Sequence, residues 1–531
     1  MLLSDRHFSN RSNYVVRTLH AGLTMEEQNQ AFESPPSNIR KIVLSTNIAE
    51  TGVTIPDVVF VIDTLSVKEV RYNESTRVSS LVKCLVPQSS AEQRRGRAGR
   101  VREGFCFRLV THDTFAALHK ELTPEMLRVP LTDMCLNVLV TQMKITPQYQ
   151  RMTPEKYLAL ALDPPDPKAI AAALTTLEEV GAVASVASTT SKPHLEEEQQ
   201  VAEEAARTIG AIRIEPLGFL LANIPADVKI GKILIMGAIM KCLRPSLIVA
   251  ASLAYKTPFV TPMEKRTEAA MARREFHRND AGKPLRSDHL AIVNAYTLFA
   301  SKLLSKKIKA HALKHWCRTK FLSYQILSSM KDTIVEFEGY LTAMGFLPTA
   351  TKERGQIMDT HANKPCVVLA ALSSGLWPNV ATITRSSTSS GTLPIIAVQN
   401  KIAAIHPSSI NFKISTDMLL SHTNSKSSGF LCYHDLMQTS KCYLRDTSVV
   451  SAACILLLCG NGSDASVVFG KQKVIVHGWI QISITSKAAV LIIQLRKRLN
   501  AYLLQKVAHP SRIETKEDRE LSKMMARLLE V

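Results

Sequence analysis

One octapeptide constrains this chain more than any other segment. Residues 93–100 read Gln-Arg-Arg-Gly-Arg-Ala-Gly-Arg, with four arginines and two glycines in eight positions. They lie between the apolar residues 85–87 and a strand-like segment at 105–110. Glycine permits close backbone approach, and arginine presents a planar charged fork to phosphate oxygens. The octapeptide therefore predicts a phosphate-binding loop in an α/β layer, although by itself it leaves open a solvated basic loop or a localisation patch.

Two strand-length apolar runs precede this loop. Residues 41–45 (Lys-Ile-Val-Leu-Ser) and 58–62 (Val-Val-Phe-Val-Ile) are each bounded by polar or turn residues, as buried parallel strands usually are. Ligands of open parallel sheets bind at the carboxyl ends of the strands. Hydroxyl and amide side chains follow the first run at Thr46, Asn47, Thr51 and Thr54. This spacing predicts contacts to a sugar-phosphate chain, whereas an ordinary strand-to-helix turn is the alternative.

The charge balance indicates a polyanionic partner. The formal net charge is +19, which favours nucleic acid first and an anionic membrane surface second. The ten cysteines include no Cys-x-x-Cys pair, so we expect neither a zinc finger nor another metal site, and the pattern fits a reducing compartment. The longest apolar stretches, such as residues 449–459, are shorter than the roughly 20 residues of a spanning helix. We expect a protein of the cytoplasm or the nucleus, without a membrane partner.

The remainder of the chain changes character twice. A one-face apolar stripe at Leu127, Leu131, Cys135 and Leu139 predicts a small helical region. After a polar insertion the pattern is helical again up to about residue 338. Beyond residue 365 short Val-, Ile-, Ser- and Thr-rich segments predict a small barrel or sandwich, and a final helix is expected at about 487–507.

Taken together, three motifs resemble those of DEAH/RHA-type RNA helicases. The octapeptide resembles the family's motif VI, and residues 46–51 (Thr-Asn-Ile-Ala-Glu-Thr) resemble its motif V. Residues 19–23 (Leu-His-Ala-Gly-Leu) are similar to motif IVa, where the family usually has Ser after His. The subgroup that it most resembles includes the helicase acting with the small ribosomal subunit during scanning. The quadruplex-resolving helicase and its neighbours are the runner-up.

The resemblance implies a multidomain fold. It would comprise an α/β RecA-like second motor lobe, incomplete at its start, mainly helical winged-helix and ratchet domains, and a β-rich OB-fold domain. The expected boundaries are 1–125 for the lobe, 126–185 for the winged helix, 186–216 for a polar insertion and connection, 217–338 for the ratchet, 339–510 for the OB-fold domain and 511–531 for a helical tail.

The resemblance also implies roles for individual residues. Gln93, Arg97 and Arg100 would face the ATP phosphates, the arginines as catalytic fingers. Phe32 would stack on the adenine and Thr54 would lie by the ribose. The family's acidic residue near the ribose is replaced by Pro56, so Asp57 is its candidate substitute. RNA would be held by His20, Thr46 and Asn47, and by a strand-separating hairpin at 59–81 that carries Lys68 and Arg71.

Half of an ATP site is not found in the sequence. No Gly-Lys-Ser, Gly-Lys-Thr or Asp-Glu-Ala-His run occurs in the 531 residues, so a first RecA-like lobe would be required to hold ATP and its Mg²⁺. The chain is either the corresponding portion of an ATP-dependent RNA helicase or a non-catalytic RNA- or ribosome-binding protein derived from one. A DNA-directed motor is a third reading, because phosphate contacts distinguish the two nucleic acids poorly. Whether this chain is itself an enzyme stays undecided at this point.

Overall fold

The computed structural model contains two compact units. It describes residues 5, 8, 10, 12–20, 23, 28–52, 55–73, 78–100, 102–144, 152–185, 208–209, 212–262, 265–279, 281–305, 309–348, 357–385, 394–398, 401–421, 428–439, 441–460, 465–468 and 472–530. Unit 1 holds residues 1–72, 80–129 and 260–266, and unit 2 holds the rest. Each unit is described by itself.

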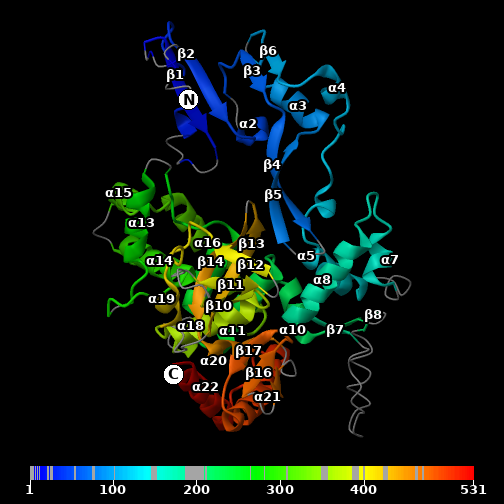
Figure 1. Cartoon of the computed structure of the whole chain (residues 1–531), viewed down its shortest axis with the longest axis vertical. Helices are drawn as coiled ribbons and strands as arrows, with labels where there is room; N and C mark the ends of the chain where they lie inside the picture. The colour runs from blue at the N-terminus through cyan, green and yellow to red at the C-terminus, as the bar shows by residue number, and fades with distance from the viewer. Residues whose placement is uncertain are drawn as a thin grey trace. The chain divides into compact units, whose positions relative to one another are not determined.

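Unit 1 is an α/β layer of parallel strands (blue to cyan in Figure 1). Strand β1 (Tyr14–Leu19) pairs in parallel with β2 (Arg40–Ser45), and β3 (Phe60–Asp63) pairs in parallel with β6 (Phe105–Arg108). The short helices α2 (Ile48–Thr51), α3 (Gln88–Arg95) and α4 (His112–Ala116) lie in the connections. The predicted α/β lobe is confirmed, but its described parallel strands form two separate two-stranded sheets.

One face of the β3/β6 sheet is apolar and open to solvent. Phe60 faces Phe105 across the register and Ile62 faces Phe107, and the Phe60 and Phe105 rings are stacked at 5.8 Å. The exposed fractions of these residues are 62% for Phe60, 69% for Ile62, 58% for Phe105 and 54% for Phe107. Parallel sheets are normally covered on both faces, so an exposed apolar face is unusual for a sheet of this kind.

The predicted hairpin is displaced along the chain. Its strands are β4 (Ser66–Asn73) and β5 (Val78–Leu85), which are neighbours in one sheet. The prediction of 59–81 was wrong at both ends, because the apolar residues from Phe60 to Asp63 belong to the parallel strand β3 and the second hairpin strand continues to Leu85. Polar and apolar residues continue to alternate up to Leu85, so the sequence pattern does not support an end of the hairpin at residue 81.

Unit 2 begins with the winged-helix region. Its helices are α5 (Thr132–Gln142), α7 (Pro154–Leu158) and α8 (Pro167–Val180), and β9 (Ile212–Ile214) lies between β7 (Val183–Ser185) and β8 (Thr208–Ile209). Helix α8 starts with Pro at its first position and ends at Gly181, whose φ of +86° forms a left-handed cap. The predicted polar insertion falls largely on residues 186–207, outside the described part of the chain.

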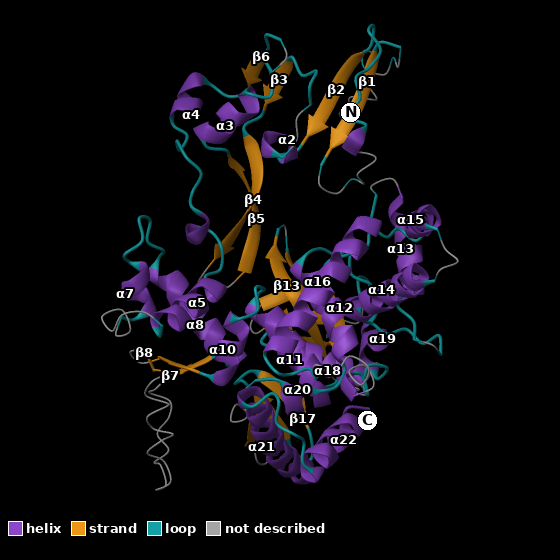
Figure 2. Cartoon of the chain, turned by 180° about the vertical axis from the view of Figure 1, so that it is seen from behind, coloured by secondary structure: helices purple, strands orange, loops and turns teal. Residues whose placement is uncertain are grey.

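A helical bundle follows, as predicted for the ratchet domain (Figure 2). Its helices are α10 (Pro216–Ala222), α11 (Val228–Ile239), α12 (Leu243–Ala254), α13 (Arg266–Glu275), α14 (Asp288–Leu304), α15 (Ala310–Thr319) and α16 (Tyr324–Ala343). Helix α11 is buried on nearly all sides, as expected for a helix whose residues other than Lys229 and Lys232 are all apolar. A Cβ at Gly375 would lie 2.8 Å from the Cα of Ile233, so glycine permits helix α18 (Pro365–Leu376) to pack directly on α11.

The β-rich domain is a closed five-stranded barrel. Its strands are β10 (Val380–Thr384), β11 (Ile395–Val398), β12 (Lys401–Ile405), β13 (Ser428–Gln438) and β14 (Cys442–Val450). They follow the order β10-β11-β12-β14-β13, and an additional β10–β13 pairing closes the barrel. Helix α19 (Thr416–Leu420) precedes β13 and α20 (Ala452–Leu458) follows β14. The OB-fold prediction is confirmed.

The end of the chain forms its own small module. Strands β15 (Ala465–Val468), β16 (Lys473–Val476) and β17 (Ile480–Ser483) make a separate antiparallel sheet, followed by α21 (Ser486–Ala508) and α22 (Lys516–Glu530). The final helix predicted at 487–507 is present as α21. However, Lys473 to Val476, predicted as part of the OB-like region, lies outside the barrel strands. No helix among the described residues is long and apolar enough to cross a membrane.

Candidate nucleotide and RNA site

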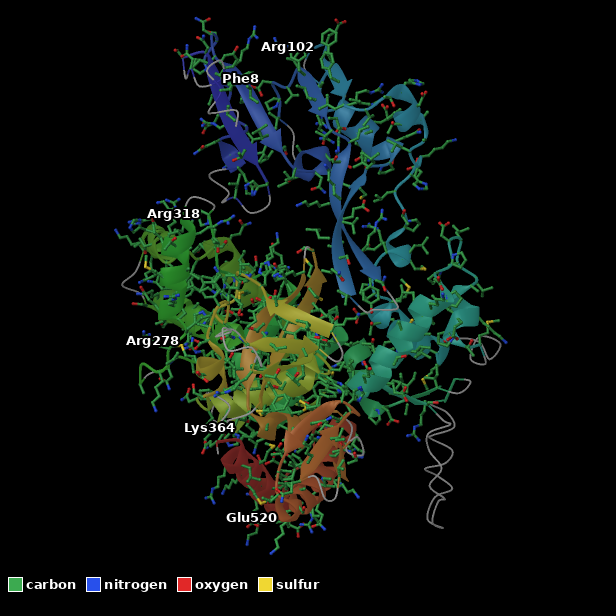
Figure 3. All side chains as sticks on the ribbon, in the orientation of Figure 1. Phe8, Arg102, Arg278, Arg318, Lys364 and Glu520 are labelled. Atoms are coloured by element: carbon green, nitrogen blue, oxygen red, sulfur yellow. The ribbon has the colours of Figure 1, made fainter. Side chains whose placement is uncertain are left out.

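The octapeptide spans the end of a helix and the turn that follows it. Gln93 lies in the last turn of α3 and is exposed, Arg97 is half-buried, and Arg100 is exposed. Gly99 adopts a φ of +81°, which other residues rarely adopt. A Cβ at Gly104 would lie 2.6 Å from the backbone nitrogen of Gly99, so this second glycine lets the loop pack closely. Figure 3 marks the region by Arg102.

Arg94 joins the arginine loop to motif V. Its Nε donates to Glu50 of α2 at 2.9 Å, and its Nη1 donates to Asp63 at the end of β3 at 3.0 Å. The side chains of Arg94 and Asp63 are only 14% and 5% exposed. The same Asp63 oxygen accepts the backbone N–H of Leu65, whose φ is +53°. Helices α2 and α3 and strand β3 are therefore fixed to one another by a mostly buried ionic network.

A second ion pair holds the segment around Phe32. Lys41 of β2 lies 2.8 Å from the carboxylate of Asp57, and it donates to the carbonyls of Ala31 at 3.0 Å and Glu33 at 2.9 Å. Phe32 is half-buried and packs against the small core of Leu19, Ala31 and Ile55. Asp57 thus orients the segment that carries the predicted adenine-stacking ring. Thr54, the predicted ribose contact, lies outside the described residues.

The predicted RNA-contacting residues of motifs IVa and V meet at one edge. Leu19 and Ser45 are register partners at the ends of β1 and β2, so His20 and Thr46 leave the two strands side by side. The backbone N–H of Thr46 donates to the carbonyl of Leu19 at 3.1 Å. Asn47 follows as the N-cap of α2, is exposed, and makes no capping bond through its side chain. The structure therefore brings together three of the predicted RNA contacts at the carboxyl ends of parallel strands.

The other two predicted contacts lie on the hairpin. Lys68 and Arg71 are both on β4 and both exposed, and Arg71 is 3.8 Å from the carboxylate of Glu69. Strand β4 belongs to a different sheet from β1 and β2, the strands that lead to His20 and Thr46.

Residues that the motif assignments did not include complete the arrangement. Arg94 lies within the octapeptide, but nothing in the sequence indicates that it points inward to Glu50 and Asp63 while its neighbours face out. Lys41 reads as part of an apolar strand, so its contact with Asp57 was also missed. A charged residue within an otherwise apolar strand is a useful signal, because such a charge, when its side chain is buried, normally has a partner.

Unit 2 contains a junction between the ratchet helices and the barrel. Asp288 is fully buried and accepts bonds from Arg273 at 3.1 Å, from the backbone N–H of Ile410 at 3.0 Å and from that of Thr447 at 2.9 Å. His289 contacts the hydroxyl of Ser448 at 2.7 Å. Burial lowers the pKa of His289 to about 4, so its imidazole is neutral at neutral pH.

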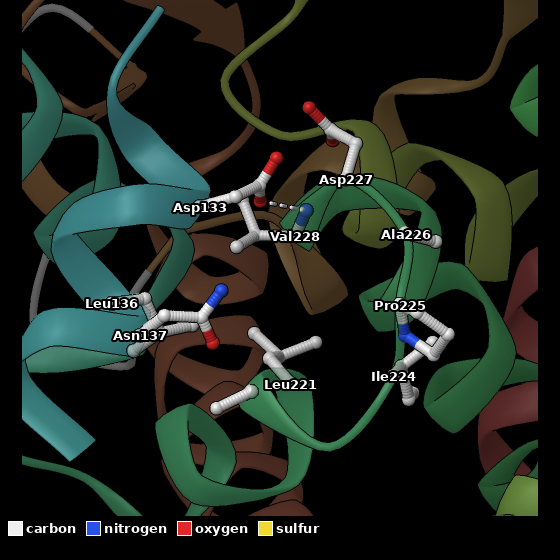
Figure 4. A pocket seen from close by; sticks show the side chains of 10 residues that line it. Asp133, Leu136, Asn137, Leu221, Ile224, Pro225, Ala226, Asp227 and Val228 are labelled. Carbon is white, nitrogen blue, oxygen red and sulfur yellow. Dashed lines mark hydrogen bonds between the residues drawn. The ribbon is translucent and has the colours of Figure 1, made fainter. Parts of the chain in front are cut away.

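A pocket of about 300 Å³ also lies in unit 2, between α5 and the connection from α10 to α11. Asp133 accepts the backbone N–H of Val228 at 3.1 Å (Figure 4). Burial and the neighbouring Asp227 raise the pKa of Asp133 to about 6. Among the described residues, no group of three or more His, Cys, Asp or Glu side chains is arranged to hold a metal ion. The pocket is lined by the carboxylates of Asp133 and Asp227 and by the apolar side chains of Leu136, Leu221 and Ile224.

Four family models match successive parts of the chain. The helicase conserved C-terminal domain matches residues 2–102, and the ratchet-like helicase associated domain (HA2) matches residues 227–292. The oligonucleotide/oligosaccharide-binding (OB) fold matches residues 368–462, and the C-terminal domain in RNA helicases matches residues 472–531. The last match coincides with the separate terminal module, which the sequence prediction had divided between the OB-fold domain (to residue 510) and a helical tail (511–531).

Similar proteins cover nearly the whole chain. "ATP-dependent RNA helicase DHX29" of Homo sapiens is 35% identical over 518 residues, which are 96% of this chain and 34% of that protein. "Putative ATP-dependent RNA helicase DHX57" of Mus musculus is 33% identical, over 96% of this chain and 36% of that protein. "ATP-dependent DNA/RNA helicase DHX36" of Mus musculus is 30% identical, over 97% and 46%. The chain thus spans about a third to a half of the length of these relatives.

Proposed function

Because the chain belongs to the DEAH/RHA family of RNA helicases, in which it corresponds to a carboxyl-terminal portion, we propose that it supplies the second motor lobe and the accessory domains of an ATP-dependent RNA helicase. The observation that carries this proposal is the Arg94 network. It fixes α2, which begins at the predicted RNA-binding Asn47, to α3, which leads into the predicted arginine fingers. Nucleotide binding and RNA binding would thereby act through one rigid block.

The residues of the arginine loop fit a polyphosphate. Gln93, Arg97 and Arg100 offer an amide and two guanidinium groups, and the octapeptide contains no carboxylate. Guanidinium groups stabilise the negative charge that spreads over a transferring phosphoryl group. ATP, when bound, supplies the phosphoanhydride whose hydrolysis drives movement along RNA. Phe32 would stack on its adenine, and Asp57 would orient the Phe32 segment through Lys41.

The partners follow from the same chemistry. A first RecA-like lobe would hold the Mg²⁺ ion and the other side of the phosphates, and RNA would run along the edge of His20, Thr46 and Asn47. The small ribosomal subunit is a further proposed partner, and the cytoplasm is the proposed location, with the nucleus as the alternative.

An ATPase measurement tests the proposal. The purified chain should bind RNA but hydrolyse ATP negligibly by itself, and adding a P-loop lobe from a family member should produce RNA-stimulated turnover. Arg97→Ala should then reduce this turnover by about 10³-fold or more, whereas Arg102→Ala, just beyond the octapeptide, should not. Turnover by the chain alone that disappears with Arg97→Ala would refute the division of the site between two lobes.

The alternative is a non-catalytic RNA- or ribosome-binding protein. No P-loop sequence occurs in the 531 residues, so the chain alone does not distinguish the two proposals. Transcript sequencing distinguishes the two proposals, because an in-frame upstream P-loop and acidic box support the helicase, and their absence supports the binding protein.

A further inference from the structure

Helix α21 of the terminal module (Figure 2) has one continuous exposed side. At about 100° per residue, all of its exposed residues fall within a single arc of about 140° around the helix axis. The arc combines three basic residues with three large apolar ones, and it contains no carboxylate. Its members are Ser486, Lys487, Val490, Leu491, Gln494, Lys497, Arg498, Ala501, Leu504, Gln505 and Ala508.

The opposite side of α21 fixes the rotation of the helix about its axis. Arg496 is 2% exposed, and its guanidinium donates to the backbone carbonyl of Leu456 at 2.7 Å and to that of Cys459. These carbonyls lie at the end of α20, where a cation is favourable, so one buried arginine holds the two helices together. Ala489 and Leu499 pack into the core of the same unit. The exposed arc therefore has a fixed orientation in the folded unit.

Residues along the centre of the arc recur with the spacing of a heptad repeat. Their intervals alternate between three and four residues, as they do for the a and d positions against which a second helix packs in a coiled coil. Val490 and Leu504 belong to this series, are 40% and 51% exposed, and lie about 21 Å apart along the axis. Leu491 lies beside the series and is 66% exposed. The series is Lys487, Val490, Gln494, Lys497, Ala501, Leu504 and Ala508.

The basic residues of the arc are not neutralised by carboxylates nearby. Residues 465–513 contain eight Lys and Arg residues and no Asp or Glu. Within the described part of the chain, Lys487, Lys497 and Arg498 form no ion pair. Helix α22 provides a comparison, because it carries four basic and four acidic residues over 516–530. Mixed charges of that kind suffice for solubility, so solubility does not require a single sign of charge on α21.

The combination of apolar and basic residues selects among anionic partners. A helix that lies in a membrane surface has a continuous apolar side, whereas Lys497 lies in line between Val490 and Leu504 on α21. A phosphate backbone binds cations and does not require large apolar side chains, and the arc has no aromatic ring on which a base could stack. A second copy of α21 would bring like charges together. An acidic amphipathic helix satisfies both features, because its apolar side chains cover the apolar residues while its carboxylates pair with the cations.

We propose that the exposed arc of α21 is a docking surface for an acidic amphipathic helix of a partner protein. Apolar side chains of that helix pack along the heptad series, and its Asp or Glu side chains lie opposite Lys487, Lys497 and Arg498. The surface consists of residues of the terminal module only, so it is independent of the nucleotide and RNA contacts proposed for unit 1.

Binding of a designed helix to the full chain tests this surface. The probe is a fluorescent synthetic peptide of three heptads with Leu at a and d, Glu at e and g, and Ala elsewhere. A second peptide with Lys at e and g is its control. The chain should bind the Glu peptide about tenfold more tightly than the Lys peptide, and added salt should reduce this difference. The double variant L491A/L504A should weaken binding of the Glu peptide about tenfold. The double variant K497E/R498E should invert the preference, so that the Lys peptide binds more tightly.

Variants of α22 separate this surface from a general effect of apolar area or charge. M524A/L528A removes apolar side chains that are 46% and 38% exposed, and K516E/K523E reverses two exposed charges. Both should bind the Glu peptide as the unchanged chain does, and equal effects of the α21 and α22 variants would overturn the proposal. Two other outcomes would also overturn it. In the first, K497E/R498E loses binding to oligouridylate or to phosphatidylserine vesicles but keeps its affinity for the Glu peptide. In the second, the unchanged chain is a dimer that L491A/L504A dissociates, which would assign the arc to a second copy.

Discussion

Replacement of Arg94 by methionine should lower the free energy of unfolding of unit 1. Methionine retains much of the apolar volume but removes the guanidinium, which leaves the carboxylates of Glu50 and Asp63 without their shared partner. Removing one partner of a buried ion pair typically costs about 3–5 kcal/mol. Because Glu50 and Arg94 are each 14% exposed, we expect the lower end of this range, about 3 kcal/mol.

The expected loss is large enough to measure in the intact chain. For a unit of this size, about 3 kcal/mol corresponds to a fall of roughly 10 °C in its unfolding temperature. Hydrogen exchange is the suitable assay, because it reports unit 1 and unit 2 separately within one molecule. Amides of α2, β3 and α3 should exchange faster in the variant, whereas those of α11 and α18 should not change.

Arg95→Met is the matched control. Arg95 is adjacent in sequence, its side chain is 63% exposed, and its contact with Glu92 at 2.6 Å is a surface pair within one helix. Such pairs contribute about 0.2–0.5 kcal/mol. Equal protection of α2 and β3 in the Arg94 and Arg95 variants would refute the reasoning that Arg94 is the structural arginine of the octapeptide.

Three further outcomes follow from contacts elsewhere. Asp288→Asn should destabilise unit 2 by about 3 kcal/mol in denaturant unfolding. An amide cannot replace the buried carboxylate in accepting from Arg273 and two backbone N–H groups. Asp417→Asn, at the exposed ion pair with Arg385, is the control and should change stability by less than about 1 kcal/mol. The pKa of His289 is lowered to about 4, so unit 2 should lose stability as the pH falls from about 6.5 towards 4, where the unfolded chain binds the proton first. A His289→Gln variant that unfolds with the same pH dependence would contradict this. Ile62→Lys places a charge on the exposed apolar face of the β3/β6 sheet. The variant should therefore bind less of a hydrophobic dye and self-associate less than the unchanged chain. Light scattering measures the self-association, and equal scattering from the two proteins would contradict this prediction.

The sequence predicted the order of domains because each has its own periodicity and its own motifs. Strand-length apolar runs, helical stripes and the glycine cap at residue 181 are local patterns, and each appears in the structure at or near its predicted position, although β2, expected to be buried, has no buried residue. The hairpin and the terminal module were placed less well. Strands of different sheets share the same two-residue alternation of polar and apolar side chains. This alternation therefore does not show that β3 and β4, or the barrel strands and β16, belong to different sheets.

The sequence predicted the candidate site as motif positions, not as side-chain directions. Motifs V and VI predict roles for Thr46, Asn47, Arg97 and Arg100, but the direction of each arginine depends on which carboxylates lie nearby after folding. Arg94 turns inward because Glu50 in α2 and Asp63 at the end of β3, both distant from it in sequence, lie close to each other in the folded unit. Such a contact is a property of the tertiary structure, so periodicity cannot indicate it.

This distinction separates two kinds of arginine within one octapeptide. Arg94 is satisfied by carboxylates of its own lobe, so its charge is already neutralised before any nucleotide binds. Arg97 and Arg100 lie in the turn beyond the helix, and Gly99 and Gly104 permit the backbone conformation that places this turn against β3. A finger acts efficiently only if its position is fixed in advance, because reorganisation at the moment of reaction would consume the electrostatic gain. In the proposed site the buried arginine would therefore provide the rigidity, and the two arginines after the helix would provide the charge. Conservative replacement with lysine should be tolerated least at Arg94, where the planar fork must reach two carboxylates at once.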